Sequence, residues 1–127
     1  MAKNMPDVET LIGKLCEKDP RYAQEAYLFL LESVDRMMKL QGEHSPKGQV
    51  HLSVEQLLIG LCNCIINRFG PMSYAVLNKW GIYDSSDFGE LVFNLIKVHL
   101  LGKSKDDKKE EFAGLFTLHE VFEEPYL

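Results

Sequence analysis

One stretch, residues 51–101, carries the clearest helical periodicity in the chain and constrains its fold most. Apolar residues recur there at spacings of three and four, as in helices with one buried face. Gly70–Pro71 and Gly81 interrupt the pattern. Glycine tolerates the left-handed conformation that ends a helix, and proline suits the first turn of the next one. The stretch therefore predicts three short helices that pack against one another.

Helix start signals in the sequence support the division into three helices. Ser53 with Gln56, and Asp87 with Glu90, have the spacing of a capping box. The predicted buried faces are Leu57, Leu58, Leu61, Cys62, Ile65 and Phe69, then Met72, Val76 and Trp80, then Phe88, Leu91, Val92, Leu95, Ile96 and His99.

Two further helices are expected in the N-terminal half. Asp7 can cap a short helix, and Asp19 followed by Pro20 is typical of the start of a longer one that reaches about Leu40. The longer helix has a broad apolar face formed by Ala23, Ala26, Tyr27, Leu30, Leu31, Val34, Met37 and Met38. Residues 41–50 are rich in glycine, proline and polar residues and predict a loop, and residues 1–5 are expected to be disordered.

The last quarter of the chain changes character. Residues 103–111 form a charged linker, and residues 112–127 form an aromatic–acidic tail. The tail either folds back onto the core or docks onto a partner as an amphipathic segment. The expected fold class is all-α: one domain, residues 1–127, built as a compact bundle of about five helices plus a short C-terminal helix or arm.

Composition narrows the range of possible functions. The net charge is −5 and no basic stripe is present, which disfavours nucleic-acid binding. No N-terminal apolar region or membrane-length apolar run occurs, and the three cysteines are an odd number. These features predict a cytoplasmic protein with reduced thiols and no membrane partner.

Catalytic and metal-binding motifs are missing from the sequence. It contains no glycine-rich phosphate loop, HExxH, CxxC or GxSxG, and its four histidines are scattered. Cys62 and Cys64 would point about 200° apart on a helix, so they cannot share a metal ion. We therefore expect no enzyme activity, catalytic residue, metal or cofactor.

Aromatic and methionine side chains supply the candidate binding residues, because a small core cannot enclose them all. The candidates for partner binding are Met72, Tyr74, Trp80, Tyr83, Phe112, Phe116, Phe122 and Tyr126.

Several segments resemble known sequences. Residues 19–35 (DPRYAQEAYLFLLESVD), 69–82 (FGPMSYAVLNKWGI), 87–96 (DFGELVFNLI) and 100–107 (LLGKSKDD) resemble a family of small uncharacterised bacterial proteins, which implies no particular activity. More faintly, the positions His51, Leu57, Leu58, Val76, Leu77, Gly81 and Ile82 are similar to a half-repeat of the N-terminal domain of Clp-type chaperone ATPases. That likeness implies binding of adaptors or protein substrates.

Three functions remain open from the sequence. The first is a non-catalytic protein–protein interaction or adaptor-like module, monomeric or homodimeric, whose partner is unknown. The second is a helix-turn-helix regulator built from residues 71–80 and the helix after Asp87, although Lys97 is the only cation in its recognition helix. The third is a small-ligand binder or enzyme that uses a pocket between helices.

Overall fold

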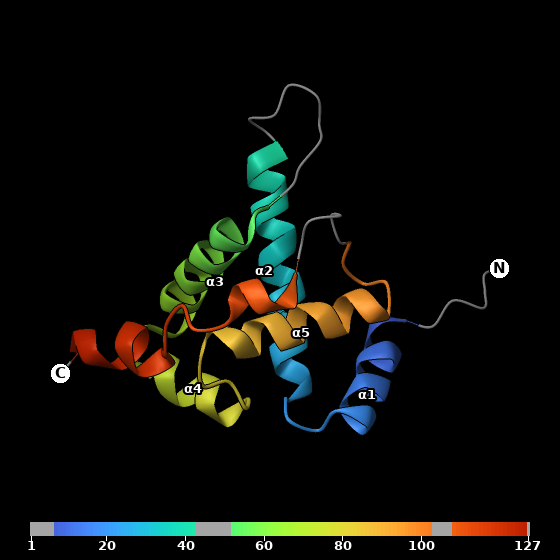
Figure 1. Cartoon of the computed structure of the whole chain (residues 1–127), viewed down its shortest axis with the longest axis horizontal. Coiled ribbons are helices and arrows are strands. Elements are labelled where there is room, and N and C mark those ends of the chain that lie inside the picture. Colours follow the sequence, from blue (N-terminus) through green and yellow to red (C-terminus); the bar gives the residue numbers. More distant parts are fainter. Residues whose placement is uncertain (1–6, 43–51, 103–107, 127) are drawn as a thin grey trace.

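The computed structural model describes residues 7–42, 52–102 and 108–126 and confirms an all-α fold (Figure 1). The helices are α1 (Val8–Lys18), α2 (Gln24–Gly42), α3 (Val54–Phe69), α4 (Ser73–Lys79) and α5 (Ser85–Lys97). The shorter helical turns are η1 (Gly70–Met72), η2 (Lys109–Phe112), η3 (His119–Glu123) and η4 (Glu124–Tyr126). Within these ranges the only β-type pairing is an isolated bridge between Asp84 and Thr117.

Helix α5 crosses the centre of the molecule (Figure 1). It packs against α2 on one side and against η2 on another, so it is covered from two directions. Helix α3 lies beside α2, and α4 lies with η3 near the C-terminal end. The fully buried Leu91 and Leu95 of α5 belong to one continuous apolar core that includes residues from all five helices.

Gly89 on α5 explains how η2 approaches so closely. A Cβ atom at this position would lie 2.8 Å from the Cβ and Cγ atoms of Phe112. The ring of Phe112 therefore occupies the space that any other residue at position 89 would fill, and it is 2% exposed.

Several predicted helix boundaries are confirmed. The Asp7 side chain accepts a hydrogen bond from the Thr10 N–H, and Ser53 with Gln56 forms a complete capping box. Gly70 ends α3 with a φ of 51°, and Gly81 follows α4 with a φ of 95°. These signals are local, because each depends on residues fewer than five positions apart.

The predicted helix start at Asp19–Pro20 is wrong. Asp19 is the C-cap of α1, and α2 begins at Gln24. The Ala23 N–H donates to the Trp80 carbonyl at 3.1 Å instead of forming part of a helix. A tertiary contact with the end of α4 thus moves the start of α2 to a later residue.

The predicted start of α5 is also displaced. Asp84 is the N-cap, and Asp87 is the capping-box partner at the third helical position. The Asp87 carboxylate accepts hydrogen bonds from the backbone N–H groups of Tyr83 and Asp84, and from the Tyr22 hydroxyl at 2.5 Å. Glu90 has no capping role and pairs instead with Arg21 and Lys109, both at 3.2 Å.

Two predicted core positions, Met72 and His99, are corrected. In α4 the buried residues are Ser73 and Leu77, whereas Met72 is 61% exposed; Trp80 is half-buried and packs against the core. His99 is exposed and lies beyond the end of α5 with a φ of 65°. The 3.6-residue pattern continues past the point where the backbone leaves the helix, so it assigned His99 to a helix face that does not exist there.

Parts of the predicted non-helical segments lie outside the described residues: 1–5, 43–50 and 103–107. Gln41 and Gly42, expected in the loop, continue α2, and residues 109–111 of the expected linker form η2 together with Phe112 of the expected tail. None of the described helices combines the length and apolar character that a membrane span requires.

Asp19 joins three elements through hydrogen bonds. Its carboxylate accepts a forked pair from the Arg21 guanidinium at 2.8 and 2.7 Å, and a third bond from the Asn94 side-chain amide at 3.1 Å. The same amide donates to the Tyr27 hydroxyl at 3.0 Å. Hydrogen bonding from Arg21 is the main reason that the pKa of Asp19 lies well below its usual range.

We predict that Gly89→Ala destabilises the protein by about 1–3 kcal/mol, the typical cost of overpacking a core. The added methyl group would displace Phe112 and loosen residues 109–112 from α5. Urea unfolding measures the loss, and hydrogen exchange locates it. Gly102→Ala is the matched control because no atom lies within 4 Å of its added Cβ. Equal stability of the two variants would contradict the close approach of Phe112 to Gly89.

We predict that Asp19→Asn lowers stability by about 1 kcal/mol at pH 7, a modest value because the Arg21 side chain is half exposed. The folded pKa of Asp19 lies below the unfolded value of about 3.9. Its stabilisation is therefore complete above about pH 5 and is lost as the pH falls through the folded pKa.

Unfolding curves at pH 7 and in steps down to about pH 2 check this, because the difference between Asp19→Asn and the wild type should shrink with acidity. Asp35→Asn, which breaks an exposed pair with Lys39 at 3.1 Å, serves as the control. It should cost less than about 0.5 kcal/mol at pH 7. A difference for Asp19→Asn that stays constant with pH would contradict the ionic role.

Candidate interaction surface

The C-terminal segment, residues 108–126, folds back onto the core. Phe112, Leu118 and Phe122 are 2%, 0% and 1% exposed. Burial of each side chain contributes about 2 kcal/mol, which is enough to hold the segment against the core. Of the two placements that the sequence left open for the tail, the structure has the packed one.

Backbone pairing fixes the register of the C-terminal segment. The Ser85 N–H donates to the Phe116 carbonyl at 3.0 Å, and the Leu118 N–H donates to the Tyr83 carbonyl at 3.1 Å. The buried Ser85 hydroxyl donates to the Phe112 carbonyl at 2.6 Å and accepts the Leu115 N–H at 3.1 Å. One serine therefore holds both ends of the turn around Gly114, whose φ is 72°.

Phe112 and Phe122, two of the predicted partner-binding residues, are buried in this structure. Both rings belong to the core, so they are not part of its exposed surface. Aromatic character alone does not tell whether a side chain lies in the core or on the surface. Phe112 is buried because Gly89, far away in the sequence, leaves the space that its ring fills.

Three other predicted partner-binding residues are strongly exposed. Met72, Tyr83 and Tyr126 are 61%, 60% and 49% exposed, and Leu115, which the sequence did not single out, is 55% exposed. We call these four residues the C-terminal surface. They come from η1, η4 and the two paired segments around Ser85. Helix α4, which follows η1, packs against η3, which precedes η4.

Tyr74 and Phe116 are half-buried and support this surface from below. The Tyr74 ring centroid lies 6.2 Å from that of His119, and the Phe116 centroid lies 6.4 Å from that of Phe88. Their positions tie α4 and α5 to the C-terminal segment, so the surface has a fixed base.

Trp80 lies elsewhere. Its ring centroid is 5.7 Å from that of Phe29 and 5.6 Å from that of Phe69, in an aromatic cluster between α2, α3 and α4. Trp80 is therefore not part of the C-terminal surface, and the eight predicted residues do not form one site.

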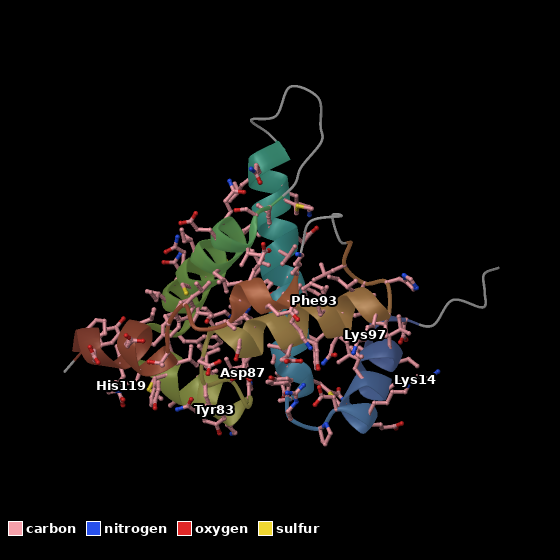
Figure 2. The ribbon with its side chains drawn as sticks, in the orientation of Figure 1. Lys14, Tyr83, Asp87, Phe93, Lys97 and His119 are labelled. Atoms are coloured by element: carbon pink, nitrogen blue, oxygen red, sulfur yellow. The ribbon has the colours of Figure 1, made fainter. Side chains whose placement is uncertain are left out.

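Acidic side chains border the C-terminal surface. His119, labelled in Figure 2, contacts Glu123 at 2.6 Å through Nδ1 and Glu124 at 3.4 Å through Nε2. Backbone hydrogen bonding from Thr117 lowers the pKa of Glu120, which keeps that carboxylate ionised. The border is suited to a partner that carries cationic side chains.

The cysteines show no feature of a reactive site. All three are free thiols. Burial raises the pKa of Cys62 to about 11 and also raises that of Cys16, so both remain protonated and weakly nucleophilic at neutral pH. Across residues 7–42, 52–102 and 108–126, no three His, Cys, Asp or Glu side chains are grouped so that they could hold a metal ion.

Comparison of the chain with protein-family models, curated proteins and solved structures finds no match. The resemblance to small bacterial proteins and to the Clp-type domain therefore stays a prediction.

We predict that Ser85→Ala destabilises the protein by about 1–3 kcal/mol, because it leaves the buried Phe112 carbonyl without its donor. Hydrogen exchange should accelerate first at residues 112–118. Ser53→Ala removes a helix cap instead and should cost about 1 kcal/mol while leaving exchange at residues 112–118 unchanged. The same exchange pattern in both variants would contradict the anchoring role of Ser85.

Proposed function

We propose that the protein is a non-catalytic interaction module that binds a partner protein through the C-terminal surface. The observation that carries this proposal is the exposure of Met72, Tyr83, Leu115 and Tyr126 on elements whose undersides are fixed to the core. Exposed tyrosine and methionine on a rigid base are typical of interface centres.

The partner's chemistry follows from the surface. Four large apolar side chains call for an apolar patch on the partner. The neighbouring Glu120, Glu123 and Glu124 favour lysine or arginine around that patch. The proposal places the module in the cytoplasm, where its free thiols would stay reduced.

The helix-turn-helix alternative is weakened by the position of α5. Its residues Phe88, Leu91 and Leu95 are buried in the core, and both α2 and η2 pack against it. A recognition helix must present a free face to a DNA groove. The catalytic alternative gains no support from the protonated thiols or from the scattered histidines.

The test is co-purification of the tagged protein from native cells, with and without nuclease, followed by affinity measurement with the partner obtained. Tyr83→Ala should weaken that binding at least tenfold, because central tyrosines often contribute more than about 1.4 kcal/mol. Ile59→Ala is the matched control, since Ile59 is 57% exposed on α3 and lies outside the C-terminal surface.

Loss of the captured partners on nuclease treatment would contradict the proposal. Equal affinity of the Tyr83→Ala and Ile59→Ala variants would contradict the assignment to the C-terminal surface.

A further inference from the structure

A cleft between α2 and α3 shares no residue with the C-terminal surface. It has a volume of about 230 Å³, and its walls include Phe29, Ser33 and Arg36 from α2 with Asn67 and Arg68 from α3. Pockets for drug-sized molecules typically measure about 300–1,000 Å³, so this cleft suits a smaller group.

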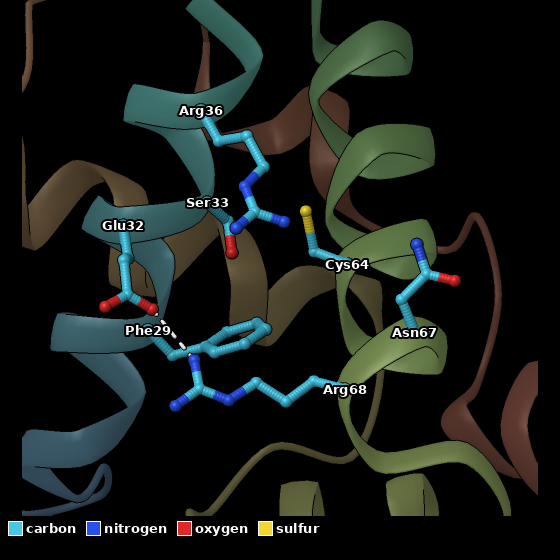
Figure 3. A pocket seen from close by; sticks show the side chains of 7 residues that line it. All are labelled: Phe29, Glu32, Ser33, Arg36, Cys64, Asn67 and Arg68. Carbon is cyan, nitrogen blue, oxygen red and sulfur yellow. Dashed lines mark hydrogen bonds and ion pairs between the residues drawn. The ribbon is translucent and has the colours of Figure 1, made fainter.

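Two arginines reach into this cleft from opposite sides. Arg36 extends from α2 toward α3, and Arg68 extends from α3 toward α2, with the ring of Phe29 between their guanidinium groups in this view (Figure 3). The whole chain has only three arginines and a net charge of −5. The Glu32 carboxylate also lines the cleft, so the two arginines leave its walls with one net positive charge.

Neighbouring side chains hold Arg68 in place. Its guanidinium carbon lies 5.6 Å from the Phe29 ring centroid and 5.9 Å from the Phe69 centroid. Its Nη1 donates to the Glu32 carboxylate at 2.8 Å. Glu32 uses one donor of the guanidinium and leaves others free, so Arg68 can bind an acceptor with little loss of side-chain entropy.

Arg36 is the less constrained cation. Over the ranges that the structure describes, no carboxylate lies within ion-pair distance of it. A planar guanidinium without a carboxylate partner is available to form forked hydrogen bonds to an oxyanion.

Ser33 supplies a neutral donor on the α2 wall. It is 5% exposed, its side chain lines the cleft, and no hydrogen bond to its hydroxyl is formed by the described part of the chain. Among the described residues, the buried side-chain atoms without a partner are Gln41 Oε1 and Asn78 Oδ1, so the Ser33 hydroxyl is accessible from the cleft. The Asn67 side-chain amide adds a second neutral donor on the α3 wall (Figure 3).

We propose that the α2/α3 cleft binds a single oxyanion, a carboxylate or a phosphate, through the Arg36 guanidinium and the Ser33 hydroxyl, with Arg68 and Asn67 adding a second positive charge and a neutral donor from α3. The group is carried either by a small molecule or by an acidic side chain of a peptide. This site is separate from the proposed partner surface, and either can fail without the other.

The test is a titration of the isotope-labelled full chain by NMR at constant ionic strength. The probes are inorganic phosphate, glutarate and a short glutamate-containing peptide, with chloride as the reference anion. Saturable shifts at residues 33, 36, 67 and 68 are expected for at least one probe. Tighter binding of the peptide would indicate a protein source of the oxyanion, and tighter binding of phosphate or glutarate would indicate a small molecule.

Matched variants sharpen the test. Arg36→Gln should weaken binding at least tenfold, whereas Lys39→Gln, which removes an exposed cation from the same helix, should leave it unchanged. Ser33→Ala should weaken binding about threefold without lowering thermal stability, because the hydroxyl it removes has no internal partner.

Shifts that do not saturate with any probe would overturn the proposal. Equal weakening by Arg36→Gln and Lys39→Gln would also overturn it, since that result indicates general charge attraction. Arg36→Gln and Lys39→Gln are both expected to fold normally. The comparison of their binding therefore does not depend on the Ser33→Ala variant.

Discussion

The burial of α5 on two sides is the constraint on which the rest of the structure depends. The apolar residues of α5 cover a broad arc of the helix surface. Burying that arc requires contacts with both α2 and η2. Gly89 makes the second contact possible by admitting the Phe112 ring at van der Waals distance. With Phe112 packed against Gly89, the hydrogen bonds of Ser85 and the backbone pairing of residues 83–85 with 116–118 determine where the rest of the C-terminal segment lies.

This arrangement also determines which side chains remain outside. The C-terminal segment buries Phe112, Leu118 and Phe122, and the turn between them leaves Leu115 exposed beside the Tyr83 segment. On α2 and α3, the aromatic cluster of Phe29, Phe69 and Trp80 supports Arg68 at the wall of the α2/α3 cleft. Two chemically different surfaces, one apolar with an acidic border and one cationic, thus arise from a single small core.

Sequence reasoning identified part of the exposed surface and left a pocket between helices open without placing it. Met72, Tyr83 and Tyr126 were candidates for partner binding, and all three are exposed, although Met72 was also assigned to a buried helix face. Phe112 and Phe122 were assigned to the same surface although the core encloses them. Arg36 and Arg68 are 32 positions apart on two different helices, so no local pattern in the sequence joins them.

The sequence by itself determined the all-α class, the N-cap at Asp7, the capping box at Ser53 and the stop at Gly70–Pro71. These features depend on hydrogen bonds and backbone conformations within a few residues, so local sequence specifies them. Only the tertiary structure decided that α2 starts at Gln24, that Asp19 binds Asn94, and that the C-terminal segment packs against α5. Those outcomes require partners tens of residues away, whose proximity exists only after the helices have packed.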